Sequence, residues 1–291
     1  MKFSYKLEYI LLICLEQILT FLPRKLALKT GELFGRALYL AGFYKTTVKC
    51  NMIHAGFWTE DQMTKIIKKL YKNIGRYGAD MLRKHRKLPP HIIHNISVID
   101  QLFAKEKGII ALLAHFGNWE FLANVFGRKI PSLNVVAKPM NNGIVDKWLA
   151  EKRAQASVKT IYTKQALRKM LEVLKENGMV AILIDQHGGK HGTMIPFLGK
   201  EASTVRTVAG LVHKTGCAVL PIYAIMKDDG TYEIIVSESA PVNTEGKTEE
   251  QIITEYQIQH NNILSEWIVN QPEHYFGWFH KRYRGLISYE L

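Results

Sequence analysis

The stretch that most constrains the fold of this chain is residues 108–120, which read GIIALLAHFGNWE. The apolar run at 109–114 has the length of a buried β-strand and carries His115 at its end, although periodicity alone also permits a helix. On a continuous helix the side chains of His115 and Glu120 would diverge by roughly 140°, and on a continuous strand they would point to opposite faces. Only a turn between these two residues brings their side chains together.

The residues after His115 predict that turn and a helix behind it. Asn118 is a typical N-cap residue for a helix over 119–126, and Glu120 would lie in the first turn, where the helix dipole favours a carboxylate. A histidine at a strand end, oriented by a carboxylate, can act as a general base. The same pattern also fits a simpler structure, in which His115 merely ends a strand and Glu120 lies on a solvated helix.

The pattern of apolar residues in the rest of the chain changes near residue 96. Residues 26–95 are basic and have apolar residues at helical spacing, with Thr59 as a helix start and a long amphipathic helix over 63–85. Beyond residue 96, short apolar runs alternate with helical stretches. The runs are 109–114, 134–137, 180–184, 218–225 and 232–236; the helical stretches are 119–126, 144–156, 165–175, 204–214 and 249–269.

This alternation predicts βαβ units and a largely parallel sheet. The run at 232–236 follows the turn Asp228-Asp229-Gly230, so we expect it to pair antiparallel with the run before it. The sequence therefore predicts an α/β fold: a mixed, mostly parallel sheet flanked by helices. We expect one domain over 26–291, with a helical part at 26–95 and an α/β core at 96–291.

Several polar residues follow the predicted strands, at the edge where open α/β sheets collect ligands. His115, Lys138 and Asp185 hold such positions. Asp185 can bind a hydroxyl or a cation there, or cap a turn. His187 and His191 have no third ligand nearby in the sequence, so we expect no metal site.

Two further segments contain residues of interest. The stretch 140–153, which ends in Arg153, is consistent with phosphate contacts or with an exposed helix face. The stretch 194–206 is interpreted as a loop, with Ser203 and Thr204 as caps of the next helix.

The N-terminal stretch 7–22 reads LEYILLICLEQILTFL and is shorter than the ~20 apolar residues that a membrane span needs. On a helical projection Glu8, Glu16, Gln17 and Thr20 fall on one half and leave a wide apolar face. We expect residues 1–25 to form a membrane-anchoring helix that lies in the interface. A core helix packed on the domain and a marginal span are the alternatives.

The charge of the chain points to an anionic partner. The formal net charge is +13, which suits nucleic acid, anionic lipid or an acidic carrier protein. A hydrophobic fraction of 47% excludes global disorder, and three widely spaced cysteines form neither a metal motif nor an obvious disulfide framework. The sequence has no Walker loop, dinucleotide fingerprint or nucleophile elbow, which disfavours nucleotide and serine-hydrolase chemistry.

Four ordered blocks of the sequence carry a resemblance to a known family. They are AHFGNWE at 114–120, IDQ at 184–186, IPFLG at 195–199 with Ala202 and Thr204, and WFHKR at 278–282. Together they resemble the bacterial lipid A late acyltransferases of the lauroyl/myristoyl type, within the HxxxxD/E acyltransferases. The resemblance covers nearly the whole chain, with Leu198 where a second Phe is usual and Lys281 where Arg is common.

The resemblance implies an enzyme of the inner membrane, with its active site on the cytoplasmic face. It would move a fatty acyl group from acyl carrier protein to a glycolipid hydroxyl, without a cofactor. His115 would be the general base and Glu120 its partner, and Arg153 would hold phosphate or the developing oxyanion. We further expect Lys138, Asp185 and Asn118 to bind substrate.

The physical chemistry of the reaction agrees with this assignment. A hydroxyl is a poor nucleophile, so His115 would take its proton during attack on the thioester, and no covalent acyl-enzyme is needed. We expect acyl carrier protein and an anionic glycolipid or membrane as partners, no nucleic acid, and a monomer. The alternatives are another acceptor (a lysophospholipid, an aminolipid or another glycolipid) and a non-enzymatic protein that binds anionic lipid.

Overall fold

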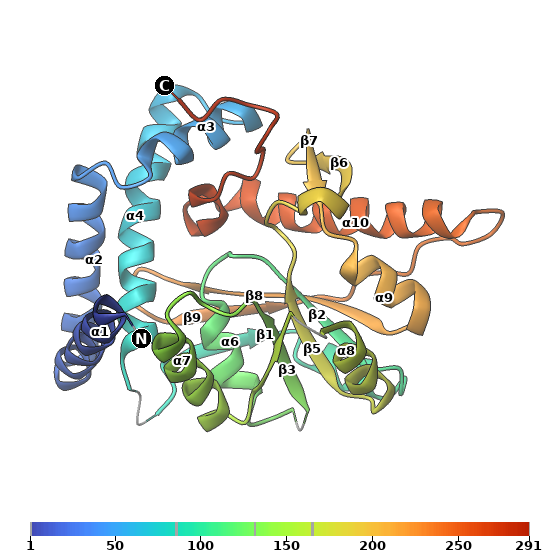
Figure 1. Cartoon of the computed structure of the whole chain (residues 1–291), viewed down its shortest axis with the longest axis horizontal. Coiled ribbons are helices and arrows are strands. Elements are labelled where there is room, and N and C mark those ends of the chain that lie inside the picture. The colour runs from blue at the N-terminus through green and yellow to red at the C-terminus, as the bar shows by residue number, and fades with distance from the viewer. Residues whose placement is uncertain (1, 85–86, 131, 164–165, 291) are drawn as a thin grey trace.

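A seven-stranded sheet forms the centre of the protein (Figure 1). The computed structural model describes residues 2–84, 87–130, 132–163 and 166–290. In spatial order the strands are β1 (His91–His94), β9 (Tyr232–Val236), β8 (Ala218–Met226), β2 (Ile109–Leu113), β5 (Met179–Leu183), β3 (Leu133–Ala137) and β4 (Lys159–Tyr162).

The pairing of the strands confirms the predicted mixed, mostly parallel α/β sheet. Strands β8, β2, β5, β3 and β4 run parallel to one another, and β9 pairs antiparallel with β8. β1 runs parallel to β9 and so opposes the other five. All five residues of the central strand β2 are buried, because a parallel strand in mid-sheet is covered on both faces.

Helices cover both faces of the sheet (Figure 1). α10 (Glu249–Asn270) crosses one face, and α6 (Trp119–Phe126) and α7 (Gly143–Gln155) lie on the other. α5 (Ser97–Phe103), α8 (Ala166–Lys175) and α9 (Thr207–Thr215) complete the α/β part. Beyond α10 come two 3-10 turns, η2 (Pro272–His274) and η3 (Phe276–Phe279).

Some local predictions were wrong. The stretch predicted as a loop is a hairpin of β6 (Thr193–Phe197) and β7 (Lys200–Thr204), preceded by the 3-10 turn η1 (Gly189–His191). Ser203 and Thr204 therefore end a strand instead of capping α9, and the Thr204 hydroxyl accepts a hydrogen bond from the buried Arg282 at 2.8 Å. Strands β1 and β4 were not predicted. The predicted helix ends at His85 and Gln165 lie outside the described residues.

The N-terminal part consists of helices, as predicted: α1 (Phe3–Phe21), α2 (Arg24–Leu40), α3 (Lys45–Ala55) and α4 (Glu60–Leu82). Thr59 begins α4 with a capping box formed with Gln62, which confirms the predicted helix start. α2 and α4 cross with their backbones almost in contact at Gly31 and Gly75. A Cβ added to Gly75 would lie 1.9 Å from the carbonyl oxygen of Gly31.

α1 packs on the domain with the side that carries Glu16 and Leu19. The Glu16 side chain is buried, and its oxygens lie 3.2 Å from Nζ of Lys84 and 3.1 Å from Nζ of Lys152, as ion pairs without hydrogen-bond geometry. Glu8 accepts a hydrogen bond from Asn142 at 2.8 Å. The structure therefore agrees with the alternative of a helix packed on the domain, but most of the apolar side chains of α1 point outward.

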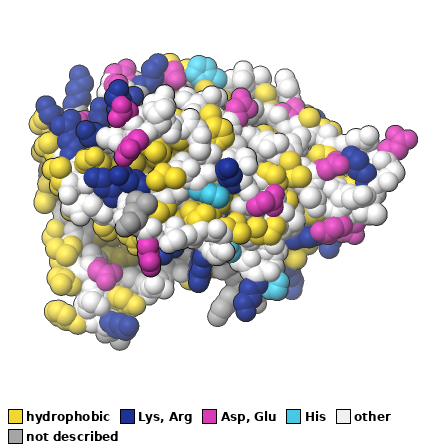
Figure 2. Space-filling view, turned by 90° about the horizontal axis from the view of Figure 1, so that it is seen from above, with side chains coloured by type: hydrophobic (Ala, Val, Ile, Leu, Met, Phe, Trp, Pro, Cys, Tyr) yellow, Lys and Arg dark blue, Asp and Glu magenta, His cyan; other side chains and the backbone are white. Residues whose placement is uncertain are grey.

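The outward face joins an apolar surface on α2. The exposed residues are Phe3, Leu7, Ile10, Leu11, Leu15, Ile18 and Phe21 on α1, and Leu26, Leu33, Phe34 and Leu40 on α2. Figure 2 shows hydrophobic side chains along the edge of the molecule where these helices lie, with lysines and arginines beside them. Among the described residues, no helix has both the length and the apolar character to cross a membrane.

We predict opposite effects for two glycine substitutions within α4. Gly75→Ala should lower the free energy of unfolding by about 1–3 kcal/mol, because the new methyl group forces α2 and α4 apart. Gly78→Ala meets no atom within 4 Å and should raise it by about 0.5–1 kcal/mol through helix propensity. Urea unfolding of both variants tests this, and equal effects would contradict the close helix crossing.

Candidate active site at the carboxyl ends of the parallel strands

His115 and Asp185 meet because their strands are neighbours in register. β2 pairs with β5 so that Leu113 lies opposite Leu183. His115 and Asp185 each lie two residues beyond this pair of leucines. Nδ1 of His115 lies 3.0 Å from Oδ1 and 3.2 Å from Oδ2 of Asp185. The two strand ends predicted as site positions thus form one hydrogen-bonded pair.

Burial and charge determine the protonation of this pair. The Asp185 side chain has no exposed surface, and that of His115 is 22% exposed. Burial lowers the pKa of His115, but the charge and hydrogen bond of Asp185, together with the charge of Glu120, outweigh burial and raise that pKa. Burial raises the pKa of Asp185, and the interaction with His115 outweighs it and holds that pKa below its ordinary value. An ionised Asp185 accepts the Nδ1–H hydrogen bond and leaves Nε2 of His115 as a proton acceptor.

The Nε2 side of His115 faces polar and aromatic groups that the sequence did not single out individually. The amide nitrogen of Gln186 lies 3.4 Å from Nε2 of His115 and 3.0 Å from Nε2 of His280. The Trp119 ring packs edge-on against the imidazole, with 5.0 Å between ring centroids. Burial and the nearby His115 lower the pKa of His280, although the charge of Asp185 opposes them.

The prediction that Glu120 orients the imidazole of His115 is wrong in its geometry. Glu120 lies in the first turn of α6 and its carboxylate turns toward α7, where Arg153 holds it with Nε 3.1 Å from Oε2 and with Nη2 on Oε1. Such a two-point contact occupies both carboxylate oxygens and is stronger than a neutral hydrogen bond. Burial lowers the pKa of Arg153, but Glu120 outweighs it and raises that pKa. Glu120 acts on His115 through its charge alone.

Two other predicted substrate-binding residues lie apart from the imidazole. Asn118 caps α6, as predicted, by accepting from the backbone N–H of Phe121 at 2.9 Å. Its amide nitrogen donates to the Tyr232 hydroxyl at 2.7 Å, so both ends of this buried side chain hold the fold together. Lys138 follows the end of β3 and is exposed. The binding roles of both residues stay predictions.

Backbone hydrogen bonds fix the loop that carries His115. Phe276 N–H donates to the His115 carbonyl at 2.6 Å, and Gly117 N–H donates to the His274 carbonyl at 2.8 Å. Gly117 has a φ of 63°, and a Cβ there would lie 1.9 Å from the Ala224 carbonyl oxygen. Only glycine fits this turn, which sets the direction of the chain between His115 and α6.

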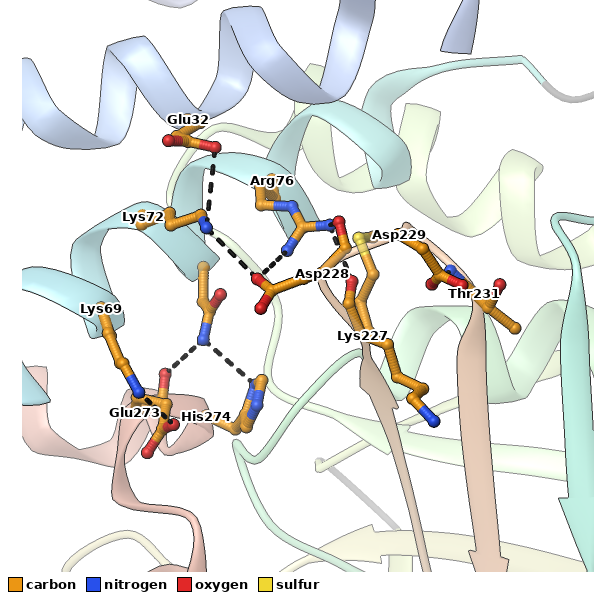
Figure 3. Close-up of polar contacts among 12 residues, drawn as sticks. Glu32, Lys69, Lys72, Arg76, Lys227, Asp228, Asp229, Thr231, Glu273 and His274 are labelled. Carbon is orange, nitrogen blue, oxygen red and sulfur yellow. Dashed lines mark hydrogen bonds and ion pairs between the residues drawn. The ribbon is translucent and has the colours of Figure 1, made fainter. Parts of the chain in front are cut away.

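A polar network ties the segment that holds this loop to α4 (Figure 3). Asn73 donates to the Glu273 carbonyl at 3.0 Å, and Lys69 pairs with the Glu273 carboxylate at 3.7 Å. Arg76 donates to the carbonyls of Lys227 and Asp228, at 2.8 and 3.0 Å, in the turn between β8 and β9. The helical and α/β parts are thereby joined directly behind the candidate site.

His274 is a neutral member of this region. Its Nδ1 lies 2.9 Å from the Tyr77 hydroxyl, which accepts from Met226 N–H at 2.8 Å. Burial lowers the pKa of His274 to about 4. An uncharged imidazole therefore lies behind the His115 loop at neutral pH, and its function there is structural.

A pocket with many cationic groups lies beside the Glu120–Arg153 pair. Its volume is about 260 Å³. The basic residues that line it are Arg83, Lys84, Lys87, Arg128, Lys152 and Arg153. Asp80 and Glu120 also line it, and each of these acids has an arginine partner, Arg24 and Arg153 respectively. The pocket can hold an anionic group such as a phosphate.

The chain was compared with known proteins. Residues 2–285 match a family model described as bacterial lipid A biosynthesis acyltransferase, in agreement with the resemblance of the sequence blocks. A search of curated proteins found no match.

We predict that Asp185, more than Glu120, controls the protonation of His115. Asp185→Asn removes the negative charge while burial persists, so the pKa of His115 should fall below its ordinary value and its protonation should move to lower pH. Glu120→Gln should give a smaller fall. An NMR titration of the histidine rings, with His115→Gln as the assignment control, measures both. A larger fall in Glu120→Gln would contradict the assignment.

Proposed function

This chain belongs to the bacterial lipid A biosynthesis acyltransferase family, and we propose that it transfers a fatty acyl chain from acyl carrier protein to a hydroxyl of a lipid A-type glycolipid. The observation that carries the proposal is the hydrogen-bonded pair of His115 and buried Asp185, which leaves Nε2 free to accept a proton. The family is one of acyltransferases, and a base of this kind activates a hydroxyl nucleophile.

The reaction follows from the geometry of this pair. Nε2 of His115 takes the proton of the acceptor hydroxyl while the hydroxyl oxygen attacks the thioester carbonyl. Collapse of the tetrahedral intermediate breaks the C–S bond, and the imidazolium returns the proton to the leaving thiolate. Asp185 fixes the tautomer and stabilises the imidazolium. Base assistance of this kind contributes typically about 10²–10⁴-fold in rate.

The oxyanion of the tetrahedral intermediate needs hydrogen-bond donors. The start of α6 follows His115 directly, and its first backbone N–H groups form the positive end of the helix dipole. Arg153 of α7 pairs with Glu120 in the first turn of α6 and supplies a full positive charge. We assign stabilisation of the oxyanion to these groups, while Glu120 holds the guanidinium in place.

The cationic pocket supports a phosphorylated acceptor. It begins at the Glu120–Arg153 pair and extends past Lys152 toward α1. A glycolipid that carries phosphate could place this group among the cations and its hydroxyl near His115. A lysophospholipid has the same charged chemistry and is the second acceptor class that this pocket favours. The net charge of +13 also suits an acidic carrier protein as donor.

The apolar surface on α1 and α2 supports a location at the inner membrane, with the site on the cytoplasmic face. A helix that buries Glu16 on the protein and exposes most of its leucines and isoleucines has the inverse of the pattern of a helix facing water. Such a surface fits the acyl region of a bilayer, with the nearby lysines and arginines at the headgroups.

We predict that acyl transfer depends on the His115–Asp185 pair. His115→Ala and Asp185→Asn should each lower kcat by about 10²–10⁴-fold, since both remove the oriented base. Glu120→Ala should also lose activity, because it leaves Arg153 without its partner. The assay follows acyl transfer from acyl carrier protein by mass spectrometry, with a phosphorylated glycolipid and a lysophospholipid as parallel acceptors. Equal turnover by wild type and His115→Ala would contradict the proposed mechanism.

We predict that membrane recovery depends on the outward face of α1. The double substitution Leu11→Asp and Ile18→Asp should release most of the protein from membranes, because two exposed apolar side chains become charged. Leu167→Asp is the matched control, since Leu167 is as exposed as Ile18 but lies on α8. Flotation with anionic vesicles measures the bound fraction, and unchanged flotation of the double variant would count against the anchor.

A further inference from the structure

The side chain of Gln186 links the imidazole of His115 to a second imidazole. Its amide nitrogen lies 3.4 Å from Nε2 of His115 and 3.0 Å from Nε2 of His280. The centroids of the two rings are 5.4 Å apart. A side-chain amide has two N–H groups on one nitrogen, so Gln186 can donate to both rings at once.

The protonation of the two rings fixes the direction of these hydrogen bonds. Because Asp185 accepts the Nδ1–H of His115, the Nε2 atom of His115 presents a lone pair. The pKa of His280 lies below its ordinary value, so this ring is uncharged at neutral pH and its Nε2 can accept as well. The shorter of the two contacts is the one to His280. One N–H of Gln186 is therefore held by His280, and the other points toward the base.

Proton transfer to His115 changes the partner that Gln186 needs. When Nε2 takes the proton of the acceptor hydroxyl, it becomes an N–H donor and can no longer accept from Gln186. In the same step the hydroxyl oxygen bonds to the thioester carbon, and the π electrons of the carbonyl move onto its oxygen. The second N–H of Gln186 thus loses its acceptor at the moment when an oxyanion forms beside it. An interaction that strengthens in the transition state accelerates the chemical step.

The position of Gln186 also suits this donor role. The attacking hydroxyl has to lie within roughly 2.6–3.2 Å of Nε2 of His115. The oxyanion is bonded to the same carbon as the attacking oxygen, so the charge develops close to the amide nitrogen of Gln186. Gln186 and His280 are both exposed, which leaves them accessible to a substrate. Arg153, by contrast, already holds Glu120 with Nε and Nη2.

We propose that Gln186 donates a hydrogen bond to the oxyanion of the tetrahedral intermediate and that His280 is the positioning residue that holds its amide. The inference rests on the proposed acyl transfer and adds a side-chain donor to the start of α6 and Arg153. When the intermediate collapses, the carbonyl forms again and the electrons of the C–S bond leave with the sulfur. The thiolate then takes the proton from His115, whose Nε2 lone pair accepts from Gln186 once more.

Two substitutions and their combination separate the two roles. Gln186→Met keeps the length of the side chain but has no N–H, so kcat should fall by about 10²–10³-fold while KM stays nearly constant. His280→Phe keeps a ring without an acceptor and should lower kcat by a smaller factor. The double variant should be no slower than Gln186→Met, because His280 acts only through the amide. Gln101→Met is the matched control, since Gln101 is an exposed glutamine on α5, before the amino end of β2.

The experiment measures kcat and KM of each full-length variant by mass spectrometry. Lauroyl and myristoyl thioesters of acyl carrier protein are the donors, and the phosphorylated glycolipid and the lysophospholipid are the parallel acceptors. All three substituted side chains are exposed, so the buried core is unchanged in every variant. Urea unfolding checks that the variants are equally stable.

The outcomes distinguish the inference from the proposed function. A loss of kcat in Gln186→Met that is absent in Gln101→Met and does not grow in the double variant supports the proposal. Wild-type kcat in Gln186→Met, or a rise in KM alone, overturns it and leaves the proposed function standing. Losses that multiply in the double variant overturn the positioning role of His280. Wild-type protein that transfers neither acyl chain overturns the proposed function, and the inference falls with it.

Discussion

The hydrogen bond between His115 and Asp185 depends on one structural constraint, the in-register pairing of β2 with β5. A carboxylate buried this completely is stable only beside a group that can carry positive charge, and a histidine gains a fixed tautomer from such a neighbour. The pairing of β2 with β5 meets both requirements, because the two strands end side by side. The same two strands pair Ala111 with Ala181 beneath the site, where these residues line an apolar cavity between α6 and the sheet.

The Glu120–Arg153 pair divides the surroundings of the site into two chemically different spaces. It lines the apolar cavity on one side and the cationic pocket on the other. Lys152, the neighbour of Arg153 in α7, contacts the buried Glu16 of α1. A continuous series of charged contacts thus extends from the helix with the outward apolar face to the edge of the site. Under the proposed function, this arrangement places an anionic headgroup, a hydroxyl and an acyl chain around one imidazole.

The sequence predicted the elements of the fold better than their pairing. The strand before His115, the helix Trp119–Phe126 and the Asn118 cap follow from local patterns, and the structure agrees with each of them. The partner of His115 was assigned to Glu120 because that residue is close in the sequence. Which strand lies beside β2 is decided by long-range packing, and no local pattern gives it. For the same reason the apolar cavity between α6 and the sheet, which is lined by residues of α5, α6, α7, β2, β3, β5 and β8, could not be derived from the sequence.

The contacts of the His115 loop also determine when this loop can form during protein synthesis. Its backbone partners are His274 and Phe276, and His280 shares Gln186 with the imidazole. His274, Phe276 and His280 leave the ribosome more than one hundred and fifty positions after His115, whereas α1 leaves it before His115. A growing chain therefore exposes its apolar helix long before the loop of His115 can take its final form. Under the proposed location, the protein would reach the lipid surface as an inactive chain and acquire its catalytic geometry there.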